Sequence, residues 1–95
     1  MAIPEVGTAL RQSLERHRFS LRPQPDVRPG EETVHVVLDN GEETFHAGHV
    51  DHHLGLWCAF AVVRPHGLFR SDEVGRHESF EDAVLAVLMS FTHVE

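Results

Sequence analysis

Lysine is absent from this sequence, cysteine occurs once, and no long apolar segment is present. The single Cys58 cannot form a disulfide within the chain, which argues against a secreted disulfide scaffold and for a reducing compartment. Residues 1–10 lack the basic and apolar stretches of a signal peptide. The longest apolar run, at residues 54–63, has about half the length that spans a bilayer. We therefore expect a cytoplasmic protein without a membrane segment.

Charge is unevenly distributed along the chain. Residues 1–28 carry five arginines against three acids, whereas residues 29–95 carry three arginines against twelve acids, and the formal net charge is −7. Because nucleic-acid binding depends on neutralising phosphates, this acidic body argues against a direct nucleic-acid partner. It favours a partner protein with a basic surface, although net negative charge also serves solubility alone.

A single domain is predicted over residues 1–95, because this length and a hydrophobic content of 41% are those of an ordinary globular unit. Apolar residues at helical spacing predict a helix at about 3–18 and a second, heavily apolar helix at 79–92, with Ser79 as its N-cap. Three prolines and a glycine in residues 22–31 predict an extended, irregular connector.

A β-hairpin is predicted at residues 33–48. Apolar and polar residues alternate on either side of Asn40-Gly41, which is a strong signal for a two-residue turn. Such a turn sets a register in which His35 lies opposite His46. One face of the hairpin is then apolar and buried, and the other face, which carries both histidines, is solvated.

A third strand is predicted at residues 54–63, where apolar residues occupy both alternate sets of positions. A strand with one solvated face should alternate, so the excess indicates either cover on both faces or a face that meets a partner chain. Residues 64–78 are expected to form a loop. The fold class that follows is α+β in the order α-β-β-β-α, with a three-stranded antiparallel sheet packed by two helices.

Histidine is the most conspicuous chemical feature, with nine in the chain. Two histidines directly opposite each other on a hairpin have Cβ atoms about 5 Å apart, and this spacing can chelate a metal ion. His35 and His46 are therefore candidate ligands, and His49 and His52 are the further candidates. The alternative is that these are incidental surface histidines, and we assign no cofactor.

The segment HVDHHLG at residues 49–55 resembles the metal-binding signature of metallo-β-lactamase-fold hydrolases. His49, Asp51 and His52 match ligand positions of that signature, but Ala47 stands in place of its first histidine. Those hydrolases are also much longer chains with further ligands on distant loops. Neither a nucleophile elbow nor a glycine-rich phosphate loop occurs in the sequence. We therefore expect no catalytic residue.

Two functional hypotheses remain. The first is a small acidic protein-binding module that acts by occlusion, as an inhibitor of a basic or nucleic-acid-handling partner, similar in kind to anti-CRISPR, immunity and antitoxin proteins. Its expected contact residues are Glu31, Glu32, Asp39, Glu42, Glu43, Asp72 and Glu73. A possible homodimer surface consists of Trp57, Leu85 and Met89. The second hypothesis is a metal-binding protein or small metal-dependent enzyme centred on the histidines between positions 35 and 53.

Overall fold

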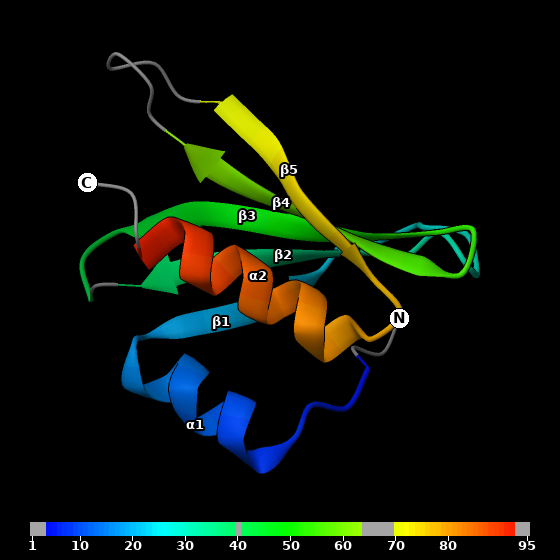
Figure 1. The fold of residues 1–95 in the computed structure, drawn as a ribbon. Helices are drawn as coiled ribbons and strands as arrows, with labels where there is room; N and C mark the ends of the chain where they lie inside the picture. Colours follow the sequence, from blue (N-terminus) through cyan, green and yellow to red (C-terminus); the bar gives the residue numbers. More distant parts are fainter. Residues whose placement is uncertain (1–3, 40, 64–69, 93–95) are drawn as a thin grey trace.

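The computed structural model describes residues 4–39, 41–63 and 70–92 and shows an antiparallel sheet with both helices on one face (Figure 1). In chain order the elements are α1 (Thr8–Arg16), β1 (Phe19–Pro23), β2 (Thr33–Asp39), β3 (Thr44–His53), β4 (Leu56–Val63), β5 (Arg70–His77) and α2 (Phe80–Thr92). The strands lie in the order β1-β2-β3-β4-β5, so each pairs with its neighbour in sequence. Among these residues no helix is long and apolar enough to cross a membrane.

The predicted three-stranded sheet is wrong, because the sheet has five strands. β1 overlaps the start of segment 22–31, and β5 lies within segment 64–78. Both are edge strands. Pro23 is tolerated in β1 because an edge strand need not donate every backbone N–H. The sequence of β5, RSDEVGRH, has little apolar character, which is common where an edge faces water.

The first helix is shorter than the predicted helix at 3–18. Gly7 is its N-cap and has extended backbone angles, with φ of −66° and ψ of 161°. Arg18 has a φ of +62°, and this left-handed conformation ends the helix and turns the chain into β1. Leu10 and Leu14 are the buried residues of α1 and join the core.

The predicted two-residue turn of the first hairpin is replaced by a longer loop. Asp39 pairs with Thr44, so four residues separate the paired positions, and Asn40 lies outside the described residues. A two-residue turn is found instead between β3 and β4, at Leu54-Gly55, where φ is +51° and +78°. Positive φ at both positions is the geometry of a type I′ turn.

A β-bulge at Ala47 changes the register within this hairpin. Val37 pairs with His46, whereas the preceding Val36 pairs with Gly48, so Ala47 is an extra residue in β3. Side chains of a strand alternate between its faces, and one extra residue reverses that alternation beyond it.

The predicted pairing of His35 with His46 is therefore wrong, and His35 pairs with His49. The face of the hairpin predicted to be buried is only partly buried. Ala47 is fully buried, whereas Phe45 is 43% exposed.

The core lies between the sheet and the two helices. Its most deeply buried side chains are Val34, Val36, Val50, Val84 and Val87. α2 approaches β3 closely above Gly48. A Cβ atom at this position would lie 2.2 Å from the carbonyl oxygen of Phe60 and 2.7 Å from Cγ1 of Val87. Only glycine fits at this crossing.

The other face of the sheet, which we call the uncovered face, has no described helix packed against it (Figure 1). β4 is an inner strand that contributes to both faces. Trp57 and Ala59 pack with the core on the helix side, whereas Phe60 stacks on His49 on the uncovered face. The apolar excess of this strand is thus explained on one face by α2 and left without a described helix on the other.

Gly48→Ala is expected to destabilise the protein by about 1–3 kcal/mol, because the new methyl group must displace backbone as well as Val87. Gly7→Ala is the matched control, since the atom nearest its new Cβ is the flexible carboxylate of Glu81 at 3.0 Å. Urea denaturation measures both free energies of unfolding. Equal losses in the two variants would contradict the close crossing of α2 and β3.

Leu54→Asn is expected to stabilise the protein by about 0.5–1 kcal/mol, because asparagine tolerates the left-handed conformation better than leucine. Little packing is lost, since Leu54 is 86% exposed. Leu54→Ala, which shortens the side chain without this backbone preference, should stay within about 0.5 kcal/mol of the parent. Thermal unfolding distinguishes the two variants, and a destabilised Leu54→Asn protein would contradict the turn geometry.

Candidate functional site

Two rows of paired residues cross the uncovered face from β2 to β5. One row consists of Thr33, Asp51, Cys58 and Arg76, and the next of His35, His49, Phe60 and Glu73. Ionisable and apolar side chains are therefore interleaved on this surface. The combination distinguishes it from the helix-covered face, whose buried residues are apolar.

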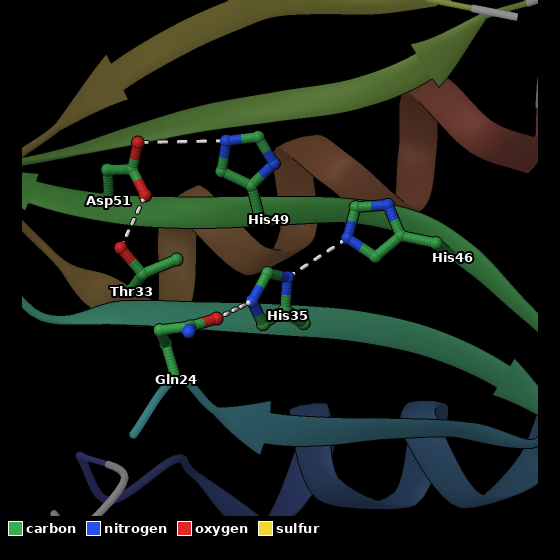
Figure 2. Close-up of polar contacts among 6 residues, drawn as sticks. All are labelled: Gln24, Thr33, His35, His46, His49 and Asp51. Atoms are coloured by element: carbon green, nitrogen blue, oxygen red, sulfur yellow. Dashed lines mark hydrogen bonds and ion pairs between the residues drawn. The ribbon is translucent and has the colours of Figure 1, made fainter. Parts of the chain in front are cut away.

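Three imidazole rings gather at the centre of these strands, and we call them the histidine cluster: His35 from β2, with His46 and His49 from β3. The ring centroids are 5.2 Å apart for His35 and His46, 6.1 Å for His35 and His49, and 6.0 Å for His46 and His49. Figure 2 shows the three rings on the same side of the two strands. The bulge at Ala47 is what allows two histidines three positions apart to share a face.

Polar neighbours hold the first ring of this cluster. Nδ1 of His35 lies 3.1 Å from Nε2 of His46, and its Nε2 lies 2.7 Å from Oε1 of Gln24 (Figure 2). Because the Gln24 oxygen can only accept, Nε2 of His35 donates and carries the proton. Nδ1 of neutral His35 is therefore left with a lone pair that points at His46.

A second polar chain holds His49. Its Nε2 lies 3.6 Å from Oδ2 of Asp51, and Oδ1 of the same carboxylate accepts a hydrogen bond of 2.8 Å from Oγ1 of Thr33 (Figure 2). The ring of His49 also stacks on Phe60 with a centroid distance of 4.7 Å. His49 is thus contacted from two sides, and 23% of its side chain is exposed.

The predicted ligand His52 lies apart from the histidine cluster. Its Nδ1 is 2.7 Å from Oε2 of Glu32, and its ring stacks on Trp57 at 4.1 Å. The motif at 49–55 is therefore divided between two faces of β3, with His49 and Asp51 on the uncovered face and His52 on the helix side. Within the described residues, no group of three or more histidine, cysteine, aspartate or glutamate side chains forms a ready-made metal site.

The acidic residues predicted as a contact surface occupy three separate places. They lie at the beginning of β2 (Glu31 and Glu32), at and after its end (Asp39, Glu42 and Glu43), and on β5 (Asp72 and Glu73). Several of them have specific partners, and Oδ1 of Asp39 accepts a hydrogen bond of 2.8 Å from the backbone N–H of Gly41. Glu32 contacts His52, and Glu73 accepts a hydrogen bond of 2.9 Å from Nε of Arg76. These acids do not form one continuous patch.

The three residues predicted as a dimer surface are also separated. Trp57 is partly buried and packs edge-on against Phe80, at the beginning of α2. Leu85 and Met89 are 37% and 59% exposed and line a groove of about 170 Å³ between α2 and α1. Trp57 therefore belongs to the core margin, whereas the other two belong to a helix surface.

A hollow beside the histidine cluster could not be predicted from the sequence. Its volume is about 400 Å³, and it is lined by Asp51, His53, Leu54, Leu56, Cys58, Phe60, Glu73 and Arg76. Arg76 lies opposite Cys58 in the register of β4 and β5. The thiol therefore has a basic neighbour across the sheet although it has none in sequence. Finding this neighbour required β5, whose polar sequence gives little strand signal.

Burial keeps two rings of the histidine cluster, those of His46 and His49, mainly uncharged near pH 7. Loss of solvent lowers the pKa values of His46 and His49 below the ordinary 6.5, and the nearby His35 lowers both further. Asp51 acts in the opposite direction on His49 but with a smaller effect than burial. Both rings are therefore mainly neutral at pH 7, with lone pairs free to accept hydrogen bonds or to bind a metal ion.

These pKa shifts predict a loss of stability on mild acidification. The unfolded chain takes up protons at these histidines near pH 6.5, while the folded chain resists until lower pH, so stability is full above pH 6.5 and falls below it. His46→Gln and His49→Gln should each reduce the fall in unfolding free energy between about pH 7 and pH 5, a range above most carboxylate titration. Urea denaturation measures the unfolding free energy at each pH, and NMR titration measures the pKa values of the two imidazole rings. Titration of both rings at or above pH 6.5 would contradict the prediction.

No protein-family model, curated protein or solved structure matches this chain. A function for it has to come from its own residues and their geometry. The uncovered face offers the most specific geometry among the described residues.

Proposed function

We propose that this protein is a protein-binding module whose contact surface is the uncovered face of the sheet. The observation that carries the proposal is the row of apolar side chains that β4 presents on that face. Leu56, Cys58, Phe60 and Val62 occupy alternate positions there and are all partly exposed. On a solvated face of an antiparallel sheet, such positions are ordinarily polar.

The centre of this surface has the composition of an interface core. Phe60 lies in an inner strand and stacks on His49, so its ring is already held in place before a partner arrives. A rigid aromatic side chain loses little conformational entropy on binding, and such residues often dominate interface energies. A partner can cover the neutral histidines around it at a smaller desolvation free energy than charged groups would require.

Charge at the borders favours a basic partner. The chain has a net charge of −7, and acidic residues stand at both ends of β2, with Glu31 and Glu32 at one end and Asp39 at the other. Acidic groups at the rim of an interface act mainly on the association rate and on the choice of partner. The proposed mode of action is occlusion: an apolar centre covers the partner's surface while the acidic borders match its basic residues.

Phe60→Arg is expected to abolish capture of the partner, because it removes the aromatic centre and places a like charge against a basic surface. Loss of a central aromatic contact alone costs about 2 kcal/mol or more, about thirtyfold in affinity. Met89→Arg is the matched control, since Met89 is an exposed apolar residue on α2. Equal amounts of each immobilised variant are compared in low-salt pull-downs from a lysate of the source organism. Circular dichroism first shows that each variant folds.

The supporting result is a protein retained by the parent and by Met89→Arg but lost with Phe60→Arg. Capture that is equal in all three proteins would remove the uncovered face as the contact surface. A protein lost only with Met89→Arg would move the interface to the groove between the helices. Self-association is measured separately by light scattering of each variant.

A further inference from the structure

The bulge at Ala47 gives the histidine cluster a geometry that a regular strand would not have. In an uninterrupted strand, His46 and His49 would point to opposite faces, because they are an odd number of residues apart. The extra residue between the paired positions Gly48 and His46 turns both toward His35. Bulges are common where a strand must re-aim a functional side chain.

We propose that His35, His46 and His49 bind one zinc-class divalent ion on the uncovered face. Nδ1 of His35 and Nε2 of His46 form the first two ligands, and His49 turns toward them to supply the third. Neutral imidazole is a preferred ligand of Zn²⁺, and three protein nitrogens with water in the fourth position make a recognised open site.

The first two ligands already stand at the required separation. With Zn–N distances of about 2.0–2.1 Å, two nitrogens on one tetrahedral ion are about 3.3 Å apart and their ring centroids about 5 Å apart. The corresponding values for His35 and His46 are 3.1 Å and 5.2 Å. The His49 centroid lies 6.0–6.1 Å from the other two, so its ring has to approach by about 1 Å. A rotation about χ1 within its staggered well moves the ring by this amount, and the broad χ2 torsion then turns the ring nitrogen toward the ion.

The groups behind the rings select the nitrogens that face the ion. Gln24 accepts from Nε2 of His35, which leaves Nδ1 free to bind. Asp51 stands behind Nε2 of His49 and is itself oriented by Thr33, so the other ring nitrogen remains for the metal. A carboxylate or carbonyl oxygen behind each ligating histidine is the usual outer arrangement of zinc sites. In Figure 2 the second nitrogen of His49 lies on the side of the ring that faces His46.

Isothermal titration of untagged, chelator-treated protein with Zn²⁺ tests this site. One ion per chain is expected, with no comparable binding of Mg²⁺, which prefers oxygen ligands. His35→Gln and His46→Gln should each weaken binding by about 100-fold or more, and Gln24→Ala by about tenfold through loss of ring orientation. His17→Gln is the matched control, because His17 is an exposed histidine at the end of α1.

His49 distinguishes a built site from a chance pair. His49→Gln should weaken Zn²⁺ binding by at least tenfold and should change the visible spectrum of the Co²⁺-substituted protein, which reports the number of nitrogen ligands. Unchanged affinity and spectrum in His49→Gln would overturn the three-histidine site. Equal losses in His17→Gln and His35→Gln, or several weak ions per chain, would show adventitious binding and would also overturn it. These measurements need no partner protein, so the metal site and the protein-binding surface can fail separately.

Discussion

One extra residue in β3 determines what each face of the sheet carries. Ala47 is fully buried, and at the residue that follows it, Gly48, α2 lies so close that a Cβ atom would stand 2.7 Å from Cγ1 of Val87. The close crossing and the bulge are therefore neighbours in one short segment. Beyond this segment the alternation of β3 is reversed, so Val50 faces the helices while His49 and Asp51 face away. Without it the histidine cluster would be split between two environments.

A second bulge repeats this effect at the other side of the uncovered face. Ala59 pairs with Gly75 and Phe60 with Glu73, which leaves Val74 as an extra residue in β5. Glu73 and Arg76 are then able to meet at 2.9 Å although they are three positions apart. Each bulge thus converts an odd spacing in sequence into a contact on one face. The chemistry of this surface depends on local irregularity more than on the regular pleat of the strands.

The same irregularities mark the limit of what the sequence predicts. Helical spacing locates both helices, and apolar content locates β2, part of β3, and β4. The two edge strands are not predicted, because β1 has only five residues and β5 is almost wholly polar. The site is predicted in part: His35, His46 and His49 do gather, but His52 does not, since an alternating pattern contains no sign of a bulge. The acidic residues are predicted to form one contact surface because they are numerous. The fold places them at both ends of β2 and on β5 instead.

The two proposals for the uncovered face meet at one side chain. His49 stacks on Phe60, the expected centre of the protein interface, and is also the ligand that must move toward the ion. Metal binding would therefore alter the support of Phe60 and add positive charge to a face that is otherwise suited to a basic partner. Both effects act on partner affinity, and by thermodynamic linkage the partner must change metal affinity by the same factor. Because one ring serves both contacts, the two binding events on this face cannot be independent.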